Sequence, residues 1–121
     1  MTEYAVLLPG DEGVWERMPP EEQAATYARH EEFAKALQAR GHKVTGGAEL
    51  AHSRTARTLR RVGDRTTVTE GPYVESVEQL SGFYLVETDD LDDLAEVCKI
   101  LLDGDGGIEI RACVDHSADE A

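Results

Sequence analysis

One short corner of the chain carries several side chains that could do chemistry. It begins at the carboxylate of Glu70, bends through Gly71 and Pro72, and continues to the phenol of Tyr73 and the carboxylate of Glu75. Glycine permits backbone angles closed to other residues and proline fixes its own φ, so covalent geometry specifies the bend. Loops held between strands commonly carry binding and catalytic groups. Glu75, together with Glu78 and Gln79 further along the loop, could bind a substrate or a metal ion, and a solvated acidic loop explains them as well.

The four histidines give no pattern typical of metal ligation. His42, His52 and His116 lack the mutual spacing of a metal site, and His30 falls within a predicted helix. The chain contains no Gly-x-Ser-x-Gly sequence, P-loop or dinucleotide fingerprint, which gives no support to a serine hydrolase or to nucleotide-binding proteins. We therefore expect no metal and no cofactor.

The acidic charge of the chain lies almost entirely in its second half. The formal net charge is −13; residues 1–65 contain ten acidic and ten basic side chains, whereas residues 66–121 contain fifteen acidic and two basic ones. Such a field repels phosphate backbones and anionic lipid surfaces, so neither nucleic acid nor a membrane is an expected partner. A hairpin just before the acidic half could pair with it within or between chains, because it carries Arg54, Arg57, Arg60, Arg61 and Arg65.

The length of 121 residues is enough for one hydrophobic core and too small for two. We expect a single domain over residues 1–116 and a disordered tail over 117–121. No apolar run approaches the roughly 20 residues needed to cross a bilayer, and the N-terminus lacks a signal-peptide pattern, which favours a cytoplasmic location. Cys98 and Cys113 fall in apolar segments without close pairing, so we expect two buried free thiols.

Apolar periodicity predicts six strands and two helices. The expected strands span 4–8, 44–51, 57–62, 65–70, 82–87 and 108–114, and the expected helices span 20–40 and 91–102. One face of the first helix carries residues that recur at three- and four-residue spacing, namely Tyr27, His30, Ala34 and Leu37. His30 is therefore expected within a buried stripe.

The order of these elements predicts an α+β fold with a ferredoxin-like βαββαβ plan and an extra β-hairpin. A loop over 11–18, which contains Trp15, joins the first strand to the first helix. Two helices can cover only one face of the antiparallel sheet, and the apolar strands favour a partner on the other face. We therefore expect a homodimer formed through sheet faces.

The stretch from Glu70 to Tyr84 resembles the DGPF subgroup of the YCII-related proteins, named for an Asp-Gly-Pro-Phe motif. The similarity extends over nearly the whole chain and includes the strand at Tyr4, Trp15, the helix start at Pro20, His30, Gly47-Ala-Glu-Leu50 and the helix start at Asp89. This resemblance implies a dimeric α+β barrel. It also implies a family of poorly defined biochemistry, in which a recurrent His and Asp have suggested an enzymatic role.

Two catalytic residues follow from the resemblance, His30 and Glu70. Glu70 stands where the family has Asp, Tyr73 replaces Phe, and Val77 replaces the usual Lys. A carboxylate beside His30 would fix the imidazole tautomer and raise its basicity, giving a general base near neutral pH. That chemistry suits proton abstraction from a small molecule by an isomerase or a lyase.

A small set of side chains is expected to bind the substrate around this pair, namely Trp15, Tyr73, Glu75 and Tyr84. The alternative function is a non-catalytic module that binds a small ligand or has a regulatory role, since a histidine in an apolar helical stripe is more often a core residue. Convergence of His30 and Glu70 on a cavity reached by solvent would favour the enzyme.

Overall fold

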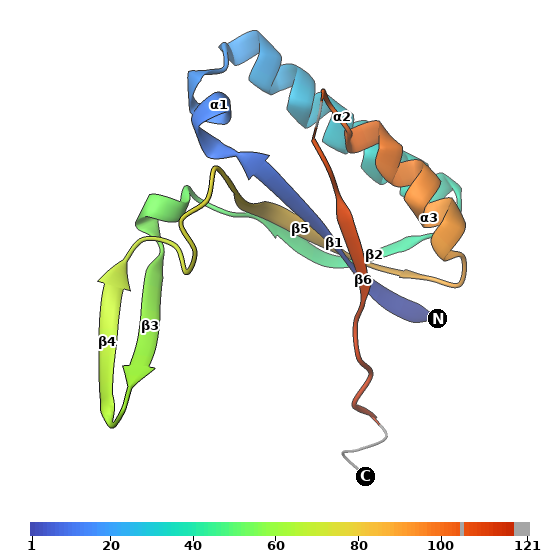
Figure 1. The fold of residues 1–121 in the computed structure, drawn as a ribbon. Helices are drawn as coiled ribbons and strands as arrows, with labels where there is room; N and C mark the ends of the chain where they lie inside the picture. The colour runs from blue at the N-terminus through green and yellow to red at the C-terminus, as the bar shows by residue number, and fades with distance from the viewer. Residues whose placement is uncertain (105, 118–121) are drawn as a thin grey trace.

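The structure is a computed structural model that describes residues 1–104 and 106–117, so residues 118–121 of the expected tail lie outside the described residues. Its main sheet has four antiparallel strands in the order β2-β5-β1-β6 (Figure 1). The strands are β1 (Thr2–Asp11), β2 (Lys43–Glu49), β5 (Glu78–Thr88) and β6 (Glu109–Ala112). Strand β5 separates β1 from β2, and β1 separates β5 from β6, which is the interleaving of a split βαβ plan. This topology confirms the α+β class and is compatible with a ferredoxin-like fold.

Helices cover one face of the sheet (Figure 1). They are α1 (Glu12–Arg17), α2 (Pro20–Ala39) and α3 (Leu91–Cys98), which continues into a 3₁₀ turn, η2 (Lys99–Leu101). The core forms where apolar side chains of the two central strands meet α2 and α3; its fully buried members are Val6, Phe33, Leu37, Val86 and Leu94. In the described part of the chain, no helix is both long and apolar enough to cross a membrane.

Two local expectations on the helical side are wrong. Residues 12–17 form α1 instead of a loop, because the side chain of Asp11 accepts hydrogen bonds from the backbone of Gly13 and Val14 and caps the helix. On α2, Ala34 is exposed, and the stripe that faces the sheet passes through His30 to Phe33.

No helix of the described chain covers the other face of the main sheet (Figure 1). This face carries apolar side chains of β1 and β5. Side chains alternate between the faces of a strand, so the residues beside the buried Val6 point away from the helices. In the pairing of β1 with β5, Leu7 lies opposite Phe83 and Ala5 lies opposite Leu85 on this uncovered face. We call the surface that contains these four residues the open face.

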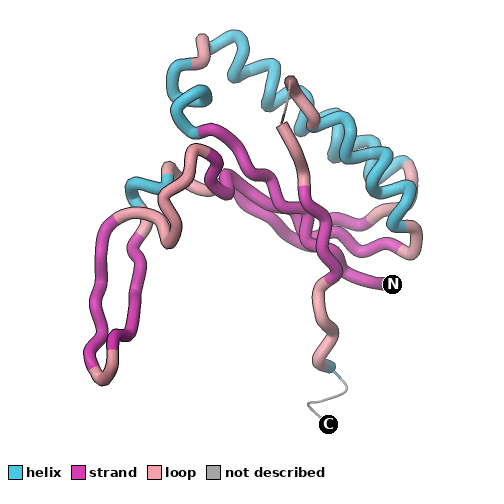
Figure 2. Tube along the Cα trace, in the orientation of Figure 1, coloured by secondary structure: helices cyan, strands magenta, loops and turns pink. Residues whose placement is uncertain are grey.

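The predicted hairpin is confirmed as β3 (Arg57–Val62) and β4 (Arg65–Glu70), and it forms a separate two-stranded sheet (Figure 2). The turn at Gly63 has φ +63°, an angle that glycine adopts without strain. We call residues 57–70 the arm. All of its strand residues except Thr58 are exposed. The arm therefore stands beside the domain and adds almost nothing to its core.

Candidate functional site

A short polar contact between the helical layer and the sheet joins His30 to Tyr84. Nδ1 of His30 lies 2.7 Å from the phenol oxygen of Tyr84, and the two rings stack with centroids 5.8 Å apart. Phe33, one helical turn beyond His30, packs against the Tyr84 ring with a centroid distance of 5.1 Å. Since Phe33 is fully buried and His30 and Tyr84 are partly buried, core packing fixes both polar groups while leaving them within reach of solvent.

Burial sets the protonation of this pair. It lowers the pKa of His30, and the positive charge of Arg29 lowers that pKa further, while the negative charge of Glu49 opposes both effects. Burial also raises the pKa of Tyr84. At neutral pH the imidazole is therefore neutral and the phenol is protonated. A neutral imidazole can accept a proton, and a protonated phenol can donate a hydrogen bond.

Tyr27 links a carboxylate and a second aromatic ring to the neighbourhood of the pair. The phenol of Tyr27, one turn before His30 on α2, donates a 2.9 Å hydrogen bond to Glu49 at the end of β2. Trp15 of α1 meets the Tyr27 ring edge-on, with centroids 5.5 Å apart. We call Trp15, Tyr27, His30, Glu49 and Tyr84 the histidine cluster. The structure thus brings together three of the expected site residues, and adds two that sequence reasoning did not assign to the site.

Glu70 does not join His30 within the protomer. No hydrogen bond or ion pair links the two residues in the described part of the chain, because Glu70 ends β4, whose only partner strand is β3 of the arm. The predicted bend at the corner is present: Gly71 has φ +107°, and its N–H donates a 2.8 Å hydrogen bond to the carbonyl of Ala56. The corner therefore closes the base of the arm instead of entering the histidine cluster.

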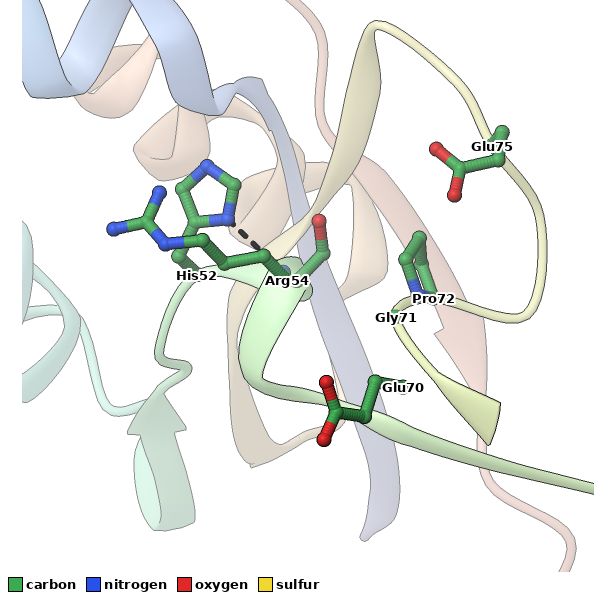
Figure 3. Close-up of a pocket in the computed structure, with 7 residues that line it drawn as sticks. His52, Arg54, Glu70, Gly71, Pro72 and Glu75 are labelled. Atoms are coloured by element: carbon green, nitrogen blue, oxygen red, sulfur yellow. Dashed lines mark hydrogen bonds between the residues drawn. The ribbon is translucent and has the colours of Figure 1, made fainter. Parts of the chain in front are cut away.

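An open pocket of about 310 Å³ lies at this base, and Figure 3 shows its walls. It is lined by His52, Ser53, Arg54, Glu70, Gly71, Pro72 and Glu75. The expected binding residue Glu75 thus shares this pocket with Glu70. Tyr73 does not line it, because the Tyr73 ring lies under the guanidinium of Arg60 at 4.9 Å and is largely exposed.

The basic side chains of the pocket are already paired with α1. Nε2 of His52 lies 3.3 Å from Glu16, and the guanidinium of Arg54 lies 2.8 Å from the same carboxylate, which lowers the pKa of Glu16. By contrast, the side-chain carboxylates of Glu70 and Glu75 make no hydrogen bond or ion pair among the residues that the structure describes. The pocket therefore offers two free carboxylates to a cationic or hydrogen-bond-donating group.

Two comparisons relate the sequence of this chain to known proteins. The sequence model of the YCII-related domain matches residues 2–111, which is most of the chain. The chain belongs to the YCII-related family. It is also similar to the uncharacterized protein R00369 of Rhizobium meliloti (strain 1021), with 32% identity over 111 residues that cover 89% of each chain. Membership of the DGPF subgroup stays a prediction, and neither match carries an activity.

A second histidine of this YCII-related protein makes a buried polar contact that the sequence did not predict. Nε2 of His42 lies 2.7 Å from Asp93, and its Nδ1 lies 2.7 Å from the hydroxyl of Thr88. Arg40 also binds Asp93. The His42 side chain is only 2% exposed, so its contacts tie β5 and α3 to the end of α2 and leave no room for a substrate.

Grouped metal ligands are absent from residues 1–104 and 106–117, where no three His, Cys, Asp or Glu side chains are arranged to hold an ion. The expectation of a metal-free protein stays a prediction. The imidazole, phenol and carboxylate groups of the histidine cluster are groups that can exchange protons and hydrogen bonds.

Proposed function

We propose that this YCII-related protein is an enzyme that moves a proton on a small carbonyl compound, in an isomerase- or lyase-type reaction. The observation that supports this function is the 2.7 Å contact between His30 and Tyr84 in a partly exposed position. A histidine sealed in the core would have no access to a substrate. Here a neutral base and a protonated donor lie side by side at the surface of the core.

The proposed step uses the two groups for different tasks. In the tautomer whose Nδ1–H donates to the Tyr84 oxygen, Nε2 of His30 is free to take a proton from a carbon beside the carbonyl. The electron pair of the broken C–H bond moves to the carbonyl oxygen, and the resulting enolate accepts a hydrogen bond from the Tyr84 hydroxyl. Return of the proton to another carbon gives an isomer, while loss of a leaving group from the neighbouring carbon gives a lyase product.

The aromatic members of the cluster would hold the substrate. Trp15 meets Tyr27 edge-on, Tyr27 lies one helical turn from His30, and the hydrogen bond to Glu49 fixes the Tyr27 ring. Aromatic walls with few polar groups are typical of sites for small organic ligands. In this proposal Glu49 is the carboxylate of the site, and Glu70 belongs to the pocket at the base of the arm.

A homodimer is part of the same proposal. The open face presents Leu7, Phe83 and Leu85 in adjacent registers, and a second copy placed on this face would bury them. Such an assembly would be the dimeric barrel expected for the family.

The test is a thermal-shift screen of small keto acids, lactones and phenols, followed by NMR of each hit in D₂O. Enzymatic proton transfer predicts deuterium exchange into the hit with wild type and at least about a hundredfold slower exchange with His30→Gln and with Tyr84→Phe. Glu70→Gln is the matched control and should keep the wild-type rate. Loss of exchange in Glu70→Gln, with normal exchange in Tyr84→Phe, would mean that Glu70, and not Tyr84, acts with His30 in the proton transfer.

The second candidate function is non-catalytic binding of a small ligand. The free carboxylates of Glu70 and Glu75 in the open pocket favour it. A hit that stabilises wild type without deuterium exchange, and that loses its effect in Glu70→Gln, would support this function.

A further inference from the structure

The arm exposes apolar side chains that a hairpin packed against another surface would bury. Leu59 and Val68 lie opposite each other in the β3–β4 register and are 70% and 62% exposed, and Val62 near the tip is 68% exposed. An isolated two-stranded hairpin is at best marginally stable in water and needs a third strand or another surface to pack against. These exposed side chains indicate that another surface covers the arm.

The arm also carries positive charges without partners. Arg60 is occupied, because its guanidinium donates a 2.6 Å hydrogen bond to the carbonyl of Tyr73 and stacks on that ring. The guanidinium groups of Arg57, Arg61 and Arg65 make no hydrogen bond or ion pair with any residue that the structure describes. The missing surface should therefore be acidic at its edge and apolar beside it.

This chain has a surface of that kind. The open face is apolar at its centre, and Glu3, Glu87 and Glu109 are on the same side of the sheet, since Glu87 lies opposite Glu3 and Glu109 lies opposite Leu7. Two cations share this side, because Lys43 lies opposite Glu87, and Arg111 lies opposite Ala5 and pairs with Glu109. The chain has a formal net charge of −13 although the arm contains four arginines and only two acidic residues. The body is thus strongly acidic, and the arm is basic.

The position of the arm agrees with a contact between copies. The arm projects away from the helices, toward the side of the sheet where the open face lies (Figure 1). A second copy that covered the open face would therefore lie beside the arm. By two-fold symmetry its own arm would reach the first copy in the same way.

We propose that the arm of each protomer docks on the acidic body of a second copy of this chain, beside its open face. Leu59 and Val68 supply the apolar contact, and Arg57, Arg61 and Arg65 pair with carboxylates of the acidic body. This inference rests on the homodimer proposed above and is independent of the proton-transfer chemistry of His30.

Sedimentation equilibrium on the full chain tests the inference through the dimer dissociation constant. The charge-reversed variant R61E/R65E and the apolar variant L59S/V68S should each raise this constant about tenfold or more. Added NaCl should weaken the wild-type dimer and have little effect on R61E/R65E. Lys35→Glu and Val14→Ser are the matched controls on the helical side, and each should leave the constant within about twofold of wild type.

Circular dichroism first establishes that each variant is folded. The variant Phe83→Glu then tests the contribution of the open face to the dimer independently of the arm. Dissociation by Phe83→Glu together with unchanged dimers in both arm variants would overturn the role of the arm and leave the homodimer in place. A wild-type chain that stays monomeric at about 100 μM would overturn both the homodimer and the role of the arm in it. Neither result bears on deuterium exchange by His30, which is measured separately.

Discussion

The phenol oxygen of Tyr84 lies 2.7 Å from Nδ1 of His30, and this contact joins residues that are 54 positions apart in the sequence. It crosses from α2 to β5, the same two elements whose packing buries Phe33 and Val86. Because the core holds both elements, the distance between base and donor depends on the fold and not on a loop. The chemistry proposed for the site therefore needs no closing segment to assemble it.

Two substitutions beside His30 should move its pKa in opposite directions. The carboxylate of Glu49 stabilises the imidazolium and the guanidinium of Arg29 destabilises it. Glu49→Gln should therefore lower the pKa of His30 further, and Arg29→Gln should raise it toward its ordinary value. Titration of the imidazole protons by NMR measures both changes.

The same titration has an internal control. Glu70→Gln should leave the pKa of His30 unchanged, because no ion pair or hydrogen bond links Glu70 to His30 among the described residues. A shift in Glu70→Gln as large as that in Glu49→Gln would mean that the two residues approach each other in solution, which would contradict the site described above.

Local signals in the sequence are sufficient to predict most of the elements. Gly63-Asp64 marks the turn of the arm, and the apolar spacing from Leu91 to Cys98 marks α3, because both depend on neighbouring residues only. The carboxylate of Asp11 is a signal of the same local kind, since an aspartate at an N-cap favours a helix over the residues that follow it, and here that helix is α1.

The carboxylate near His30 could not be found in this way. Glu49 and Glu70 both end strands, and only the long-range pairing of β2 with β5 places Glu49 on the helical side of the main sheet. The contact of His42 with Asp93 spans 51 positions for the same reason. Neither the position of Glu49 nor the contact of His42 leaves a periodic signal, since each depends on which strands pair and in what register.

The double glycine in β2 should tolerate alanine at one position only. A Cβ on Gly47 would lie 2.5 Å from the carbonyl oxygen of Phe83, and Gly47 has φ +145°. Gly47→Ala should therefore lower the free energy of unfolding by about 1–3 kcal/mol. A Cβ on Gly46 would lie nearest to a methyl carbon of Leu85, at 3.3 Å, and this side chain can move. Gly46→Ala should therefore lower the free energy of unfolding by less than Gly47→Ala does. Urea unfolding compares the two variants, and equal losses would contradict the close approach.

Cys98 should react with thiol reagents far more slowly than Cys113. Burial raises the pKa of Cys98 to about 11, and its side chain lies in the core beside Leu94, whereas Cys113 is partly exposed. The thiolate is the reactive form, so Cys98 is protected both by protonation and by access. Labelling of the single-thiol variants Cys98→Ala and Cys113→Ala with a disulfide reagent at pH 8 measures this difference. Equal rates would mean that α3 opens readily.

The contact between His42 and Asp93 should make the fold sensitive to acid. Its partners Arg40 and His42 lower the pKa of Asp93, so the folded state holds this carboxylate ionised more strongly than the unfolded state does. The stabilisation is therefore present above the ordinary pKa of an aspartate and is lost as the pH falls through the lowered value. Asp93→Asn should flatten this loss in urea titrations between pH 5 and pH 2, while Asp92→Asn, on the exposed side of α3, should keep the wild-type slope.

His42→Ala should lower the free energy of unfolding at neutral pH by about 1–3 kcal/mol, because it leaves the Thr88 hydroxyl and the Asp93 carboxylate without their buried partner. Wild-type stability in His42→Ala, or an acid slope unchanged in Asp93→Asn, would contradict a structural role for this pair.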